Sequence, residues 1–347
     1  MKKTCVYALA ALLLAAPATA GVVKKTRSSI VFQKFGSFNA TATSRLTPEM
    51  SSTDSLSEFK GKGLTGGLIG KTLFRSGNTA QIIDLAASTI TTIDNKKKEY
   101  TVGPIKKLSE EMEEARQGAE EEPQEKQEPS TIKVTKNEFT VTDTGEDADL
   151  NGFACRKYIV LWLTEWEDTQ TGDKGSSRLE SAVWTTPMSD TLKEAQAEEM
   201  KFNTAYLQKI GLDLGQAQSD MLGTKWLAML DAFGRPGSKP KQDYSRTAAE
   251  MNKVKGYPIV IDGRYDIKAI KAQGAAGGAT EEAEEAPSGI KGGLGGLLKK
   301  SLKKKPSDAA PKPDEPTLTY RIETLEISTP SLSAADFQVP AGFKKKG

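Results

Sequence analysis

The sequence contains no histidine. This absence excludes Ser-His-Asp and Cys-His catalysis, zinc sites with histidine ligands, and acid–base chemistry by imidazole. The chain has only two cysteines, Cys5 and Cys155, which are too few for a thiolate metal cage. Most common hydrolase mechanisms are therefore excluded. Carboxylate pairs, Ser-Lys pairs and cations bound by oxygen ligands remain possible, and we expect a protein that is not an enzyme.

An excess of charge of one sign is also missing, as are long apolar runs beyond the N-terminus. The formal net charge is +2, which gives no electrostatic basis for general nucleic-acid binding. No later window approaches the roughly 20 consecutive apolar residues that a membrane-spanning helix needs. The sequence thus predicts neither a nucleic-acid partner nor an internal membrane span.

The first twenty residues have the pattern of a cleaved signal peptide. Two lysines precede an apolar run from Cys5 to Ala16, and Ala18-Thr19-Ala20 offers the small residues that a signal peptidase needs. We expect cleavage before Gly21 and a product in the periplasm or outside the cell. Its one thiol would be Cys155, so it would have no internal disulfide. A retained N-terminal anchor is the alternative.

Two changes of composition divide the rest of the chain. Residues 107–131 are rich in glutamate and poor in apolar side chains, so this acidic linker cannot bury enough surface to offset its chain entropy. Residues 271–316 combine Gly, Ala, Glu and Lys, which is typical of a disordered insertion. We expect one sheet domain built from a strand meander in 21–106, strands and two helices in 132–270, and a closing strand and tail in 317–347.

The strand predictions depend on short runs of β-branched and aromatic residues between Gly, Asn and Asp. In the segment Phe153 to Trp166, alternation places Tyr158, Val160 and Trp162 on one face of the sheet. The predicted strands are Ser29–Phe35, Leu56–Lys62, Thr79–Leu85, Ser88–Asp94, Lys97–Val102, Ile132–Val141, Phe153–Trp166, Arg178–Thr185, Tyr257–Ile267 and Leu318–Ile327.

Two apolar stripes at helical spacing predict helices that cover the sheet. The first runs from Leu192 to Ile210 and is interrupted by Glu199. The second runs from Leu222 to Phe233 and is followed by a Gly and Pro stop signal. Core packing explains both stripes, and a place inside a ligand cavity is the alternative.

Three local patterns resemble chemical motifs but are incomplete. Residues 65–72 end like a phosphate-binding loop, but the first glycine is missing and no helix pattern follows, so we expect a loop. Asp147, Asp149 and Asn151 match half of a calcium loop without its closing glutamate, which favours a polar turn. The acids Glu165, Glu167 and Asp168 could form a glycosidase carboxylate pair, but a solvated turn is the favoured interpretation.

A segment from Gly289 to Lys305 combines leucines with lysines. Apolar burial and attraction to anionic lipids would both favour contact with a membrane surface, and the terminal Lys344-Lys345-Lys346 would add to it. Five glycines argue against a stable helix. A solvated linker is the alternative interpretation.

Short matches are spread over most of the chain: Ile82–Leu85, Thr89–Asp94, Lys98–Thr101, Asn151–Tyr158, Val183–Thr186, Gly256–Ile259 and Asp336–Phe343. On these segments the chain resembles a family of uncharacterised exported bacterial proteins related to periplasmic lipoprotein carriers. The resemblance implies an α+β fold, with a strongly curved antiparallel sheet that forms an incomplete β-barrel and helices on its concave side. The two long insertions depart from the compact carriers.

In the carriers this shape holds acyl chains, so the resemblance implies a non-enzymatic envelope protein without a cofactor. Its partner would be a lipid or a lipidated protein. The candidates for an apolar lining are Trp162, Trp184, Phe202 and Trp226, and ordinary core packing is the alternative for each. The alternative function is a structural or interaction protein of the cell envelope that holds no ligand.

Overall fold

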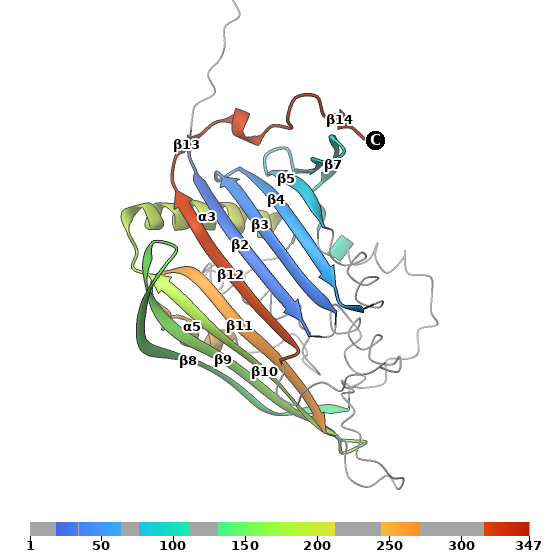
Figure 1. Cartoon of the computed structure of the whole chain (residues 1–347), viewed down its shortest axis with the longest axis vertical. Helices are drawn as coiled ribbons and strands as arrows, with labels where there is room; N and C mark the ends of the chain where they lie inside the picture. The colour runs from blue at the N-terminus through green and yellow to red at the C-terminus, as the bar shows by residue number, and fades with distance from the viewer. Residues whose placement is uncertain are drawn as a thin grey trace, which may run out of the picture.

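The structure, a computed structural model, describes residues 19–33, 35–63, 76–107, 109–110, 131–211, 244–270 and 316–346. These residues form a mainly β architecture with few helices (Figure 1). The central feature is a twelve-stranded sheet of order β14-β7-β6-β5-β4-β3-β2-β12-β11-β10-β9-β8. Its outermost strands do not pair with each other, so the sheet is open and not a closed barrel.

The strands of this sheet are β2 (Val22–Phe32), β3 (Gly36–Leu46), β4 (Met50–Gly61), β5 (Gly77–Asp84), β6 (Thr89–Asp94), β7 (Glu99–Pro104), β8 (Ile132–Leu150), β9 (Phe153–Asp168), β10 (Lys174–Thr186), β11 (Tyr257–Ile270), β12 (Leu318–Ser328) and β14 (Lys344–Lys345). All neighbours pair antiparallel except β14 and β7. The predicted antiparallel sheet is thus confirmed.

A second, two-stranded sheet lies at the N-terminal end of the described chain. It pairs β1 (Thr19–Ala20) with β13 (Ser331–Leu332), which precedes the short 3-10 helix η2 (Ala334–Phe337). Next to it, the amide of Gly21 donates to the carbonyl of Pro330 at 3.0 Å. The remainder of the expected signal peptide, residues 1–18, lies outside the described residues.

Alternation within β9 explains the main core. Tyr158, Val160 and Trp162 are buried on one face, as the sequence predicts, and they join aromatic and aliphatic side chains from both halves of the sheet. The members of this aromatic core are Phe32, Phe35, Val141, Tyr158, Val160, Trp162, Leu179, Val183, Val254, Tyr265, Leu318 and Tyr320. Because these residues come from strands on both sides of β12, the core joins the N-terminal meander to the later strands.

Two glycines allow aromatic rings to come close to the backbone of a neighbouring strand. Gly263 stands opposite Tyr320, and a Cβ atom at Gly263 would lie 2.5 Å from the Tyr320 ring. Gly175 stands opposite Trp166, and a Cβ atom there would lie 2.3 Å from the indole. Glycine is therefore required at both positions by the close approach of a ring.

In the described residues the helices are α3 (Asp190–Lys209) and α5 (Tyr244–Met251). Helix α3 begins at Ser189, whose hydroxyl accepts a hydrogen bond from the amide of Leu192 at 3.2 Å. Leu192, Ala195 and Phe202 are buried, as expected for the first predicted stripe. The second predicted helix, from Leu222 to Phe233, lies outside the described residues. In the part that is described, no helix is long and apolar enough to cross a membrane.

The free edge at β8 is protected against further strand pairing. Glu250 of α5 accepts a hydrogen bond from the backbone amide of Val141 at 3.1 Å. Further along, the register with β9 shifts between Asp143 and Asp147, so the strand bulges there. Charged side chains and bulges are common means of preventing edge-to-edge association of sheets.

Candidate functional site

One face of the sheet carries both helices, and we call it the helix-covered face. It is the face of Lys24, Ser28 and Phe32, since alternate residues of β2 point to the same side. Met251 at the end of α5 and Val254 pack against the aromatic core on this face. Helix α3 contacts β2, β3 and β12 beside Lys24. Figure 1 shows both helices behind the sheet.

A buried polar cluster fastens α3 to the helix-covered face. Lys24 forms an ion pair with Glu199, and its Nζ atom also lies 3.3 Å from the hydroxyl of Tyr257. That hydroxyl donates to the second carboxylate oxygen of Glu199 at 3.2 Å. The side chains of Lys24 and Glu199 are only 12% and 6% exposed. Strands β2 and β11 and helix α3 therefore meet at one charged contact.

The chemistry of this cluster is that of a structural contact. Burial and the neighbouring Glu199 carboxylate raise the pKa of Tyr257 above its ordinary value, so the phenol stays protonated and serves as a donor. Each of the three groups has a partner inside the cluster. The glutamate that interrupts the apolar stripe of α3 is thus explained by Lys24, a partner that the sequence alone did not identify.

Small side chains lie midway between the contacts of the two helices. Ser28 is four residues from Lys24 and four from Phe32 on β2, and it stands in register with Ala40 on β3 and Ile322 on β12. Ile322 is 38% exposed. An isoleucine on the helix-covered face is therefore open to solvent, whereas Leu318 and Tyr320 on the same side of the same strand are buried.

The four residues predicted to line a cavity do not all share one face. Trp162 is buried in the aromatic core, where its indole donates to Asn137 at 2.7 Å and meets the Phe139 ring edge-on. Trp162 pairs with Leu179 on β10, so these two side chains share a face. Trp184 follows Leu179 by five residues, an odd number, so its side chain points to the opposite face. The Lys157 ammonium lies 5.2 Å from the centre of the Trp184 ring.

Phe202 is the other predicted lining residue that the structure describes. It is buried on α3, and its ring stacks on that of Tyr206 with the centroids 6.2 Å apart. Trp226 lies outside the described residues. Trp162 and Phe202 thus lie on the helix-covered side. Trp184 points to the other face of β10 and packs against a separate cluster that contains Tyr257 and Leu192 of α3. A ligand-lining role for any of them stays a prediction.

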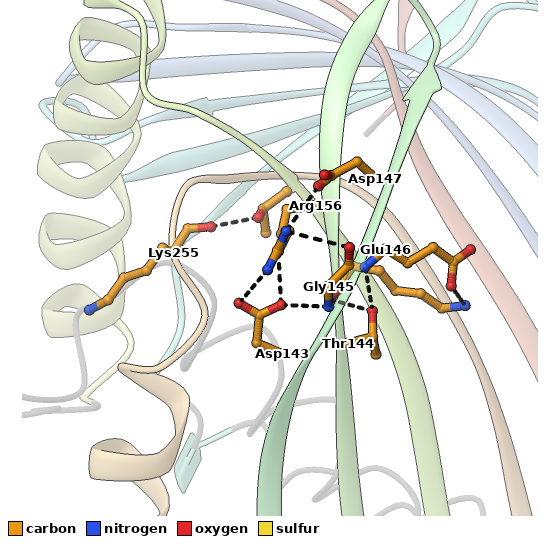
Figure 2. Close-up of polar contacts among 9 residues, drawn as sticks. Asp143, Thr144, Gly145, Glu146, Asp147, Arg156 and Lys255 are labelled. Carbon is orange, nitrogen blue, oxygen red and sulfur yellow. Dashed lines mark hydrogen bonds and ion pairs between the residues drawn. The ribbon is translucent and has the colours of Figure 1, made fainter.

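Asp147, the first residue of the half calcium loop, ends a bulge in β8 that begins at Asp143 (Figure 2), whereas Asp149 pairs regularly with Ala154. There the Arg156 guanidinium binds both carboxylate oxygens of Asp143, at 2.8 and 3.2 Å, and approaches Asp147 at 3.4 Å. The Arg156 hydrogen bond holds the pKa of the Asp143 carboxyl below its ordinary value. Asp143 and Asp147 therefore already have a cationic partner.

Further hydrogen bonds close the bulge. The amide of Gly145 donates to Asp143 at 2.9 Å, and Glu146 forms an ion pair with Lys157 at 2.7 Å (Figure 2). Among the residues with described positions, no group of three or more His, Cys, Asp or Glu could hold a metal ion. The geometry of the segment is that of a polar turn, the interpretation that the sequence favours.

The one described cysteine is unsuited to nucleophilic chemistry. Cys155 is buried with 3% exposure, and burial raises the pKa of its thiol. Its Sγ atom donates to the carbonyl of Phe153 at 3.3 Å. The thiol is therefore a small apolar member of the cluster around Tyr257 and Ile259.

A charged ladder crosses the other face of the sheet and was missed by the sequence analysis. Glu323 on β12 accepts hydrogen bonds from Arg27 at 2.7 Å and from Arg321 at 3.1 Å, and Arg321 also donates to Asp262 at 2.8 Å. Opposite charges at paired strand positions stabilise a sheet. Three neighbouring strands are thus joined through Glu323, which is buried.

The segment of residues 65–72 and the leucine- and lysine-rich segment from Gly289 to Lys305 both lie outside the described residues. Comparison with known proteins gave no match, whether to family models, to curated proteins or to solved structures. The resemblance to periplasmic lipoprotein carriers therefore remains an expectation from short segments.

Proposed function

We propose that this protein is a non-enzymatic exported binding protein that holds an apolar ligand, or the lipid group of a lipidated partner, on its helix-covered face. In this proposal the open sheet is strongly curved, and the ligand lies in its concave side between α3 and α5. The ligand would contact the small side chains of Ser28 and Ala40 and the aliphatic side chain of Ile322.

The observation that carries the proposal is the exposure of Ile322. An exposed aliphatic side chain on an outer surface needs no explanation, but Ile322 faces the side on which the helices lie. Covering it with an acyl chain would remove apolar surface from water on both molecules, which is favourable in proportion to the area buried. On β2 and β3 the residues in register with Ile322 are the small Ser28 and Ala40, and on β11 Ile261 adds a second aliphatic side chain beside it.

The polar groups of the same face also favour binding over catalysis. Lys24, Glu199 and Tyr257 bind one another, and the hydroxyls of Ser181 and Tyr320 lie 2.5 Å apart in the core. Burial raises the pKa of Tyr320 to about 12. Side chains that are fixed as partners of each other are poor general acids and bases, since proton transfer to a substrate would break their contacts.

Native mass spectrometry tests this proposal. Protein purified from its own cells under mild conditions should carry additional mass in the range of one lipid or acyl chain, and organic extraction should remove that mass. The extracted protein should take up an offered long-chain fatty acid. A bare chain that also fails to take up the fatty acid would favour the alternative, a structural or interaction protein without a ligand.

A further inference from the structure

The parallel pairing of β14 with β7 brings together two runs of lysine from distant parts of the sequence. The amide of Lys344 donates to the carbonyl of Lys98 at 2.9 Å, and the amide of Lys346 donates to the carbonyl of Tyr100 at 2.7 Å. The turn before β7 carries three lysines, and the C-terminal segment carries three more. We call Lys96, Lys97, Lys98, Lys344, Lys345 and Lys346 together the lysine edge.

The lysine edge is exposed and strongly positive. All six residues are exposed, and the side chains of Lys97 and Lys346 are 67% and 68% accessible. Segments 94–100 and 343–346 contain only two carboxylates, Asp94 and Glu99, so four positive charges are unbalanced. Both carboxylates form weak exposed pairs, Asp94 with Lys97 at 3.2 Å and Glu99 with Lys346 at 3.9 Å.

Apolar contacts fix the position of the C-terminal lysines. Phe337 is buried with Ile93 in a cluster that also includes Tyr100 and Phe343. These contacts hold the chain on both sides of η2, and β14 follows directly after Phe343. Figure 1 shows β14 beside β7 at one end of the sheet. The positive charges are therefore presented by a folded edge and are concentrated in one place.

An exposed apolar side chain lies on the same edge. Val102 on β7 is 41% exposed and follows Tyr100 by two residues, so the two side chains point to the same side of the strand. Lysines beside an exposed aliphatic group suit the boundary of an anionic bilayer, where charge attraction and apolar burial add. A soluble polyanion would use only the charges.

We propose that the lysine edge binds the anionic headgroups of a lipid membrane surface. This site is distinct from the leucine- and lysine-rich segment between Gly289 and Lys305, and it does not depend on the apolar ligand proposed above. Lysines near an anionic membrane attract it through a screened field that extends over about a Debye length, on the order of 10 Å at moderate salt.

Sedimentation with lipid vesicles tests this site in the full-length mature chain. Wild-type protein should pellet with vesicles that contain phosphatidylglycerol, should stay in solution with pure phosphatidylcholine vesicles, and should be released by high salt. The double variant Lys96→Glu and Lys97→Glu should lower the partition coefficient by more than about tenfold, given a contribution of about fivefold for each lysine.

The matched control reverses the same number of charges at the opposite end of the sheet. Lys133 and Lys136 are exposed on β8, and the double variant Lys133→Glu and Lys136→Glu should pellet nearly as wild type does. A second test variant, Lys344→Gln and Lys345→Gln, should lose binding in the same direction as the first. Thermal melting of each variant checks that the fold is retained.

Three results would overturn the site. One is wild-type protein that stays in solution with anionic vesicles at low salt. Another is an equal loss of vesicle binding in the double variant at Lys96 and Lys97 and in the control variant on β8, or full binding by both. The third is stronger capture by soluble polyglutamate than by vesicles, which would assign the lysine edge to an acidic protein partner instead of a membrane.

Discussion

Glu199 on α3 and Lys24 on β2 form a buried ion pair although they lie 175 positions apart in the chain. Tyr257 from β11 completes the contact through its hydroxyl. A buried charge is costly unless it is paired, so each member depends on the other. This contact is one of those that hold α3 on the helix-covered face, together with its buried residues Leu192, Ala195 and Phe202.

Removing one member of this pair should destabilise the fold strongly. Glu199→Leu leaves Lys24 buried without its counter-ion, and we expect a loss of about 3 to 5 kcal/mol in the free energy of unfolding. The double variant Lys24→Met and Glu199→Leu should regain much of that loss, because two apolar side chains then face each other. Urea denaturation of the wild type, both single variants and the double variant measures the coupling.

A control on the same helix is the exposed pair of Lys193 with Asp190, at 3.0 Å. Lys193→Met should change stability little, since solvent screens such pairs. If the losses in the free energy of unfolding of the two single variants, at Lys24 and at Glu199, simply add in the double variant, the two residues are not coupled and the role given to their contact is contradicted.

Gly263→Ala should destabilise the sheet by overpacking. The new methyl group would lie 2.5 Å from the Tyr320 ring and 2.9 Å from the carbonyl oxygen of Glu180, and overpacking of this kind costs about 1 to 3 kcal/mol. Gly103→Ala is the control, since no atom lies within 4 Å of a Cβ there. Thermal melting compares the two variants, and equal melting temperatures would show that the ring moves aside freely.

The charged ladder should make stability depend on pH. The hydrogen bond from Arg27 is the main reason that the pKa of the Glu323 carboxyl lies below its ordinary value. A lowered pKa in the folded state adds stability above the pKa of the unfolded chain, about 4.3, and this stability is lost as pH falls through the folded-state value. Glu323→Gln should therefore be less stable than wild type at neutral pH and should approach it in acid.

Near neutral pH the free energy of unfolding of Glu323→Gln should be about 1 kcal/mol below that of wild type. The effect is small because Arg27 is half-exposed and water screens its pair with Glu323. Denaturation at a series of pH values measures it. Glu326→Gln on the same strand is the control, since the Glu326 side chain is 72% exposed and its loss should matter little at any pH. If the difference in the free energy of unfolding between Glu323→Gln and wild type grows as the pH falls, the role of Arg27 is contradicted.

Calcium should have no effect on thermal stability. In the bulge of β8 the Arg156 guanidinium already binds Asp143 and approaches Asp147. A cation would have to displace that guanidinium, and a ligand that binds only the folded state must raise the melting temperature. Differential scanning calorimetry with saturating Ca²⁺, and with Mg²⁺ as the control ion, should give unchanged melting temperatures. A rise specific to Ca²⁺ would restore the calcium interpretation of Asp147, Asp149 and Asn151.

Patterns of large apolar side chains were sufficient to predict most of the later strands. The alternation of Tyr158, Val160 and Trp162 predicted the buried face of β9, and the structure confirms it. Strand β3, Gly36–Leu46, was not predicted, because its residues are mainly serine, threonine, alanine and asparagine. It is held by pairing along its whole length with β2 and β4, which a local pattern does not show.

The polar contacts were less accessible to sequence reasoning. Glu199 was noticed because it interrupts an apolar stripe, but its partners Lys24 and Tyr257 come from distant strands, and only the topology brings them together. The prediction that Trp162 and Trp184 line one cavity was made without knowledge of how β9 and β10 pair. Once β9 and β10 are aligned, the odd spacing between Leu179 and Trp184 places the two indoles on opposite faces.

The most direct measurement of the proposed function compares two exposed β-branched aliphatic side chains on neighbouring strands. Ile322 on β12 and Val31 on β2 are 38% and 46% exposed, and they point to opposite faces of the sheet. Titration with a fluorescent long-chain fatty acid should show that Ile322→Lys weakens binding by more than about tenfold, whereas Val31→Lys binds as wild type does. Equal affinity of both variants and the wild type, or no binding by any of them, would contradict a ligand on the helix-covered face.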